Sequence, residues 1–281
     1  MFLNSGKIKI IGTQKAALDN LYFFLKKNKK IKTSKYNINN FNEKEIKKNI
    51  KNLNTKNFLK LIKISKTHKL IIGSSSSKLE INIVNFLNEK KIKYYFYIDS
   101  ITNISKRFKG LKKIPNSIVT INEIIAKEIQ KKLKLKEEKK IINLNMPYQN
   151  YLLKKYGKII RTNTNYLYLT SFLGLNKEKQ NINYLLKKFN FKNDKNKLYI
   201  CIHPRENLNK WKTHFENNSK IKVFQNKSFF SFKSIKNVYG VSTMGLINFK
   251  FAGFCVKYFK KKISKDDLIL KLYKRYNIKP V

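Results

Sequence analysis

Short apolar runs alternate with longer stretches of helical periodicity along most of the chain. The runs Leu70 to Gly73, Tyr94 to Ile98 and Leu198 to Ile202 have the length and unbroken hydrophobicity of buried parallel strands. Elsewhere apolar residues recur three and four positions apart, as between Glu123 and Leu133. Repeated strand–helix units of this length predict an α/β fold with helices on both faces of parallel sheets. The expected strands are 7–12, 70–73, 94–98, 117–120, 141–144, 166–170, 198–202, 222–224 and 237–241, and the expected helices are 16–27, 43–64, 79–88, 123–133, 179–189, 246–252 and 264–276.

The alternation pauses between Asn145 and Asn163, a segment with the character of a hinge, and then resumes. We therefore expect two doubly wound halves with a cleft between them, formed by residues 1–146 and 147–281, and a last helix that packs back on the first half. A chain of 281 residues with 42% hydrophobic side chains is long enough for two cores of ordinary size.

The charge balance is strongly basic, with 63 Lys and Arg against 16 acidic residues and a formal net charge of +47. Such an excess ordinarily indicates a nucleic-acid-binding protein. Here only four of the basic residues are Arg, and Asn, Ile, Phe and Tyr are also abundant, which is the composition that A/T-rich codons produce. The lysines are spread along the chain, so we interpret most of them as solvated helix faces. A nucleic-acid surface and attraction to anionic lipid are the competing interpretations.

The chain has two cysteines far apart, Cys201 and Cys255, which indicates neither a disulfide framework nor a zinc cluster. The first residues lack the pattern of a signal peptide, and no apolar run approaches the length of a membrane span. We expect a cytoplasmic protein that meets a membrane, if at all, peripherally at its inner face.

Two strand ends carry candidate chemistry. The strand that ends at Ile202 is followed by His203-Pro204, which places an imidazole at the carboxyl edge of a sheet. Such a His titrates near neutrality and donates to phosphate. The second is Ser242-Thr243, two hydroxyls where a helix begins, a place suited to phosphate. The structural alternatives are that His203 caps the sheet through a backbone hydrogen bond and that Ser242-Thr243 is an ordinary helix N-cap.

Arg205 is placed to bind phosphate or carboxylate with its guanidinium, or else to form a surface ion pair with Glu206. In the first half, Asp99 follows an apolar strand and Asp19 follows a glycine turn, so each is a candidate general base. Asp99 alternatively caps the next helix. No cluster of residues has the spacing of metal ligands.

The two turns, on two Rossmann-like halves, resemble those of the GT-B-fold glycosyltransferases, in particular their bacterial sialyltransferase, polysialyltransferase and glycerophosphotransferase-like members. The segment Phe96 to Phe108, with Asp99, Asn103 and Arg107 after an apolar strand, is similar to a pattern in surface-polysaccharide proteins. Asn145 to Tyr148 resembles a turn that closes the first domain of many such enzymes.

The resemblance implies a GT-B-like fold in which the second half binds the donor phosphate without a metal or cofactor. The donor-binding residues that it implies are His203, Pro204, Arg205, Ser242, Thr243 and Asn248, the last standing where many relatives have a ribose-binding Glu. The acceptor-side candidates are Gly12, Gly73, Ser74 and Arg107. Arg107 alternatively pairs with an acidic neighbour, and the 73–77 turn alternatively caps a helix.

The expected function is transfer of a sugar from a nucleotide donor to a surface glycan or a lipid-linked acceptor. A nucleotide-sugar epimerase shares the architecture but calls for more acidic and His residues in the cleft than the sequence shows. A degenerate, binding-only relative of the transferases is a third possibility. A basic nucleic-acid-binding protein is the fourth, and it would gather its lysines on one face among aromatic side chains.

Overall fold

The computed structural model describes residues 6–12, 21, 31–37, 68–73, 77–98, 104–135, 140–189, 196–225, 228–260 and 268–281, with the backbone alone for 31–37. The chain divides into two compact units, Met1–Tyr148 and Gln149–Val281. The helices expected at 16–27 and 43–64 lie outside the described residues, apart from Leu21, which is helical.

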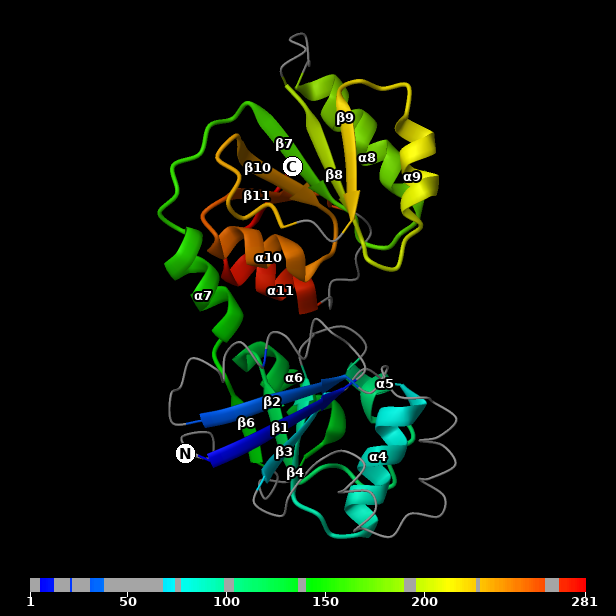
Figure 1. Ribbon diagram of the computed structural model, residues 1–281, viewed down its shortest axis with the longest axis vertical. Helices are drawn as coiled ribbons and strands as arrows, with labels where there is room; N and C mark the ends of the chain where they lie inside the picture. The colour runs from blue at the N-terminus through cyan, green and yellow to red at the C-terminus, as the bar shows by residue number, and fades with distance from the viewer. Residues whose placement is uncertain are drawn as a thin grey trace. The chain divides into compact units, whose positions relative to one another are not determined.

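The first unit contains a parallel sheet of six strands (Figure 1), in the order β2-β1-β3-β4-β5-β6. Its central strands are apolar and buried because parallel sheets are covered on both faces. The strands are β1 (Gly6–Gly12), β2 (Ile31–Asn37), β3 (His68–Gly73), β4 (Tyr94–Ile98), β5 (Ser117–Thr120) and β6 (Lys140–Asn143).

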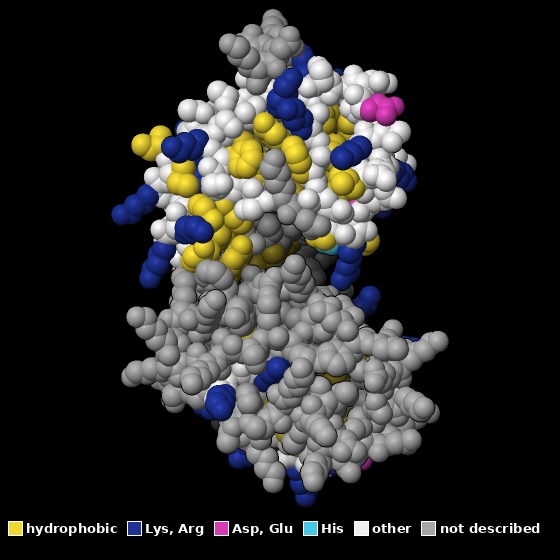
Figure 2. Space-filling view, viewed as in Figure 1, with side chains coloured by type: hydrophobic (Ala, Val, Ile, Leu, Met, Phe, Trp, Pro, Cys, Tyr) yellow, Lys and Arg dark blue, Asp and Glu magenta, His cyan; other side chains and the backbone are white. Residues whose placement is uncertain are grey.

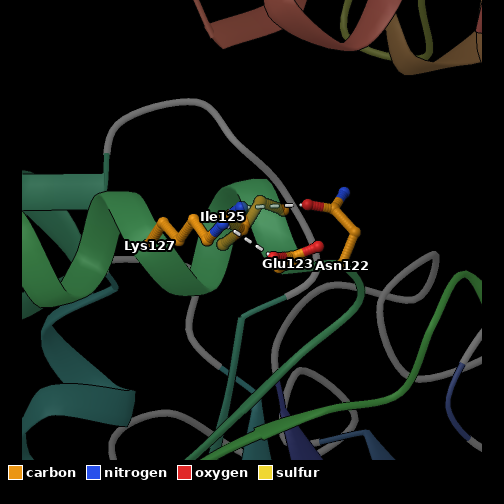
Figure 3. A network of polar contacts seen from close by, with 4 residues as sticks. All are labelled: Asn122, Glu123, Ile125 and Lys127. Carbon is orange, nitrogen blue, oxygen red and sulfur yellow. Dashed lines mark hydrogen bonds and ion pairs between the residues drawn. The ribbon is translucent and has the colours of Figure 1, made fainter. Parts of the chain in front are cut away.

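The described helices of the first unit are α4 (Lys78–Glu89), α5 (Ile104–Phe108) and α6 (Glu123–Leu133). Polar residues cap the start of α4 and of α6. The side chain of Ser77 accepts a hydrogen bond from the Glu80 amide, so the helix-cap interpretation holds for this serine. Figure 3 shows the start of α6, where Asn122 Oδ1 accepts from the Ile125 amide at 2.9 Å. Glu123, the first residue of α6, forms an exposed ion pair with Lys127 one turn later.

The second unit has its own six-stranded parallel sheet, in the order β12-β11-β10-β7-β8-β9. The strands are β7 (Asn165–Leu169), β8 (Leu198–Ile202), β9 (Ile221–Gln225), β10 (Ile235–Gly240), β11 (Cys255–Tyr258) and β12 (Lys279–Pro280), and the helices are α7 (Pro147–Tyr156), α8 (Leu175–Lys188), α9 (Leu208–Phe215), α10 (Met244–Phe251) and α11 (Leu268–Arg275).

Alternate residues of the central strands β7 and β8 face opposite sides of this sheet. Tyr168 and Ile200 join a buried cluster with Trp211 of α9 and apolar residues of α8. Leu169 faces the other side, where it meets Gly245 of α10. Helices therefore cover both faces, as the apolar strand sequences require.

The expected hinge between Asn145 and Asn163 is largely a helix, α7, which begins at Pro147. Proline is well suited to this first helical position because its missing N–H needs no partner there. The end of α7 is fastened within the second unit by buried Arg161, which donates to the Tyr156 and Phe230 carbonyls and lies over the Phe254 ring. Burial lowers the pKa of this guanidinium.

Candidate functional site

The carboxyl edge of the second sheet brings His203 and Ser242 into one neighbourhood. His203 follows β8 and Ser242 follows β10, and β7 lies between these two strands. All three strands are parallel, so their carboxyl ends meet at the same edge. The strand order therefore places both candidates at one edge of the sheet.

Two residues that directly follow β7 connect the candidates. The His203 amide donates to Thr170 Oγ1 at 2.7 Å, and the Ser242 amide donates to Ser171 Oγ at 3.0 Å. The hydroxyls of these two adjacent residues therefore fix the backbone of the His203 turn and of the Ser242 turn. Sequence reasoning did not select Thr170 or Ser171, although a Thr-Ser pair directly after an apolar strand repeats the Ser-Thr pattern after β10.

Two carboxylates, those of Glu178 and Glu206, accept hydrogen bonds from the Thr170-Ser171 pair. Glu178, buried in the first turn of α8, accepts from the Ser171 amide at 2.7 Å and from the Tyr168 hydroxyl. Burial, together with the nearby Glu178 charge, raises the pKa of Tyr168 well above its usual range. Glu206 Oε2 accepts from the Thr170 hydroxyl and from the His203 amide at 3.2 Å. These two carboxylates thereby fix the residues that follow β7, the middle one of the three strands.

The turn that carries His203 is clamped along its backbone. The Gln225 side-chain amide donates to the carbonyls of Glu206, Pro204 and His203, at 2.8, 3.3 and 3.4 Å. Arg205 is exposed, and within the described residues no ion pair joins it to Glu206. The guanidinium is therefore available to an anion at this edge.

The surroundings of the His203 imidazole favour its neutral form, with an N–H group that can donate a hydrogen bond. The Arg205 amide donates to His203 Nδ1 at 3.2 Å, which places the proton of the neutral ring on Nε2. Partial burial lowers the pKa of His203 from its usual value, and nearby Arg205 lowers it further against the opposing effect of Glu206. The ring is expected to act near neutral pH through Nε2–H and not as a permanent cation.

The Ser242-Thr243 turn uses most of its backbone amides internally. Thr243 is the N-cap of α10, accepting from the Gly245 amide at 3.1 Å, so the N-cap interpretation holds for it. Its own amide donates to the buried Tyr273 hydroxyl at 2.9 Å, and that hydroxyl donates to the Thr243 carbonyl at 3.0 Å. The side-chain hydroxyls of the turn, more than its amides, are what it offers to a ligand.

Two glycines allow α10 to begin this close to β7. A Cβ on Gly240 would lie 3.0 Å from the Leu169 carbonyl oxygen, and one on Gly245 would lie 3.1 Å from the Leu169 side chain. Further along the helix, Asn248 Oδ1 accepts from the Gln149 amide at 2.8 Å. One side of the Asn248 amide is therefore already occupied by Gln149, a partner that the sequence did not reveal.

The first-unit candidates are described only in part. Gly12 and Gly73 end the adjacent strands β1 and β3. Arg107 lies in α5 and is 6% exposed, which favours the interpretation that it pairs within this unit. Asp19, Asp99 and Ser74 lie outside the described residues.

Within the described ranges, no group of three or more His, Cys, Asp and Glu side chains is arranged to hold a metal ion. In the same residues, no helix has both the length and the apolar character needed to cross a bilayer.

No protein-family model and no curated protein matches the chain. Solved structures do match over most of its length. The UDP-GlcNAc 2-epimerase of Methanocaldococcus jannaschii, solved with UDP-GlcNAc and UDP, superimposes with a TM-score of 0.59 at 14% identity, over 96% of this chain and 86% of that one. The enzyme of the same name from Neisseria meningitidis, solved with UDP-GlcNAc, gives a TM-score of 0.60 at 12% identity, over 94% and 85%.

UGT71G1 of Medicago truncatula, solved with UDP-glucose, gives a TM-score of 0.53 at 9% identity, over 99% and 85% of the two chains. These likenesses and the two parallel sheets establish the fold class expected from the sequence. The chain has the two-domain, Rossmann-like GT-B fold.

Proposed function

We propose that the protein binds a nucleotide-activated sugar at the carboxyl edge of the second sheet and transfers the sugar to a surface glycan or lipid-linked acceptor. The observation that carries this proposal is the Thr170-Ser171 pair, which fixes the His203 and Ser242 turns side by side. Ligands of open α/β sheets bind outside the carboxyl ends of the strands, which is where this pair lies.

In this proposal the donor phosphate accepts a hydrogen bond from His203 Nε2–H and from the Ser242 and Thr243 hydroxyls. Exposed Arg205 adds a positive charge beside it, and Pro204 shapes the turn. These groups stabilise the charge that grows on the departing phosphate, a contribution that often dominates such chemistry. Asn248 would contact the nucleotide through the side of its amide that Gln149 does not occupy.

The acceptor is proposed to enter from the first unit, with Asp99 or Asp19 taking its proton. Gly12, Gly73 and Ser74 are the residues proposed for that side, whereas the burial of Arg107 favours a role within the unit for this fourth candidate. The reaction needs no metal or cofactor in this scheme. We further propose that the protein works in the cytoplasm, in peripheral contact with an anionic membrane from which it takes its acceptor.

The solved neighbours support nucleotide-sugar binding, because each of the three described above is solved with a uridine diphosphate sugar. Two of them are named as 2-epimerases, so epimerisation of the nucleotide sugar is the second candidate. Transfer is preferred because the described part of the edge holds few acid–base groups: both oxygens of Glu178 and Glu206 Oε2 accept hydrogen bonds and Glu206 Oε1 is buried, which leaves His203.

The first experiment measures thermal unfolding in the presence of UDP, CMP, GDP and ADP, then of UDP-GlcNAc and CMP-sialic acid. A ligand that binds only the folded state raises the unfolding temperature with its concentration. We expect one nucleotide and its sugar conjugate to do so. The double variant His203→Ala/Ser242→Ala should lose this response, whereas the matched surface variant His214→Ala/Ser231→Ala should keep it.

The second experiment analyses the products formed from the bound nucleotide sugar. Transfer yields free nucleotide and a glycosylated acceptor, epimerisation yields an isomeric nucleotide sugar, and a degenerate relative yields neither. A wild-type protein that no nucleotide stabilises, or a double variant that responds like the wild type, would refute the proposed site.

A further inference from the structure

The loop between β7 and α8 carries an exposed aromatic side chain beside His203. Phe172 follows Thr170 and Ser171, is 53% exposed, and its ring centroid lies 5.2 Å from that of His203. The two rings are tilted by 38°. A large aromatic side chain is thus exposed to water next to His203, the residue proposed to donate a hydrogen bond to the phosphate.

The backbone of Phe172 is also in an unusual conformation, with φ at 59°. Five other described residues besides glycine share a positive φ. Lys91, Lys134 and Asn277 come just after the end of a helix, where the left-handed conformation is ordinary, and Asn145 and Met146 lie in the short turn between β6 and α7. Phe172 instead comes directly after a strand and its two anchoring residues. A bulky residue is disfavoured here, since glycine adopts this conformation without cost.

The packing of the unit does not account for a phenylalanine at this position. A buried ring would compensate for the strained backbone through apolar contacts, but about half of this side chain remains in water. Its described ring partner is His203. The arrangement is that of a residue retained for what it contacts outside the fold.

The polar groups around Phe172 restrict what that contact is. The Ser171 amide is bonded to Glu178, the Ser171 hydroxyl to the Ser242 amide, and His203 Nδ1 to the Arg205 amide. Of the groups just named, the donor left to a ligand is His203 Nε2–H, which lies next to the aromatic face of Phe172. A nucleobase edge needs several matched donors and acceptors, whereas a sugar ring linked to a phosphate offers an apolar C–H face beside an anionic oxygen.

We infer that Phe172 is the platform for the sugar ring of the bound nucleotide sugar, which stacks on the aromatic face while its phosphate accepts from His203. This inference rests on the proposed function and adds the residue that distinguishes a sugar nucleotide from the nucleotide alone. The positively polarised C–H groups of a pyranose meet the electron-rich face of the ring. The strained backbone holds that face next to the phosphate position.

The test compares Phe172→Gly with the wild type in binding two ligand pairs, UDP with UDP-GlcNAc and CMP with CMP-sialic acid, by calorimetry. Glycine removes the ring and relieves the backbone, so the unfolding temperature should not fall. Affinity for the sugar nucleotide should fall by about tenfold, with that for the free nucleotide unchanged. Phe172→Trp, which keeps an aromatic ring, should retain the affinity for the sugar nucleotide. Tyr184→Ala, which removes an exposed ring on α8, should leave both affinities unchanged.

The possible results separate this inference from the function on which it rests. Equal weakening of nucleotide and sugar nucleotide would overturn the sugar assignment in favour of the base or ribose. Unchanged affinity for both would show that Phe172 does not touch the ligand, while leaving the proposed function intact. If neither pair binds the wild type, the proposed function fails and this inference fails with it.

Discussion

His203 is the residue on which the proposed chemistry depends most. Its Nδ1 is occupied by the Arg205 amide, and partial burial lowers its pKa from the usual 6.5. Both features favour a neutral ring that donates through Nε2–H. In the proposed function His203 therefore serves as an uncharged hydrogen-bond donor.

His203→Ala should reduce turnover on a nucleotide-sugar donor more than it weakens binding of the free nucleotide. The lost hydrogen bond is strongest when charge has built up on the leaving phosphate, a loss of about 2–4 kcal/mol or on the order of a hundredfold in rate. His203→Gln, which keeps an uncharged donor, should retain much of the turnover. Steady-state kinetics of the two variants measure the difference.

The pH profile gives the matching control. Because the pKa of His203 is lowered from its usual 6.5, the ring is mostly neutral at pH 7 and above, and turnover should not fall between about pH 7 and pH 8 on its account. A Gln variant as impaired as the Ala variant, together with wild-type activity lost over that pH range, would show that the imidazolium charge is required.

Thr170 joins His203 to Glu206 and is itself 3% exposed. Thr170→Val keeps the shape but removes the hydroxyl, leaving a carboxylate and a backbone amide each short of a partner. We expect a loss of about 1–3 kcal/mol in the free energy of unfolding, measured with denaturant. Thr213→Val, an exposed change on α9, should cost little. Equal costs for the two variants would argue against the network.

The hydroxyl of Tyr273 connects helix α11 to the edge of the sheet. Tyr273, 1% exposed, accepts from the Thr243 amide and donates to the Thr243 carbonyl. The contact bridges the last described helix and the N-terminus of α10 within one unit. Whether this helix also meets the first unit stays a prediction of the sequence.

Tyr273→Phe should destabilise the second unit by about 1–3 kcal/mol, because two partly buried backbone groups lose their partner. Nucleotide affinity should fall as well, since the Ser242-Thr243 turn is then free to move. Tyr276→Phe is the matched control, as its hydroxyl makes no hydrogen bond within the described residues. A stability loss without any change in nucleotide affinity would make the contact purely structural.

The sequence predicts elements well where burial alone dictates them. The apolar runs of β4, β7 and β8 are buried between helices and appear as predicted, because a continuous hydrophobic run suits a strand covered on both faces. Edge strands gave weaker signals. β2 contains Lys32, Ser34 and Lys35 and was not predicted, since a strand at the sheet edge tolerates polar residues.

Helix α7 was missed because the sequence was interpreted through its proline and asparagines, which occur in turns as readily as at a helix start. In the candidate site, His203 and Ser242 were predictable from motif and strand pattern. Thr170, Glu178 and Tyr273 were not, because their roles come from pairings between segments distant in sequence. Local periodicity carries no information about such long-range hydrogen bonds.

On the scale of the whole molecule, the net charge of +47 is the most conspicuous property of the chain. Figure 2 shows Lys and Arg side chains separated from one another on the visible face of the second unit, with no continuous stripe among the described residues of that face. The proposed ligand site depends instead on a few hydrogen-bond donors. A diffuse charge acts through the salt-screened field around the protein, whereas the site acts at contact.

This difference predicts how salt separates the two kinds of binding. Association with single-stranded DNA, measured by fluorescence anisotropy, should be detectable at low salt. It should fall steeply, by about three orders of magnitude or more, between 50 and 200 mM salt, because it derives from counterion release. Thermal stabilisation by the preferred nucleotide should change far less, since it neutralises few charges. DNA added at 200 mM salt should leave that stabilisation unchanged. If DNA binding instead persists at 200 mM salt and abolishes the nucleotide effect, the lysines form a dedicated nucleic-acid surface, and a basic nucleic-acid-binding protein replaces the transferase as the better account.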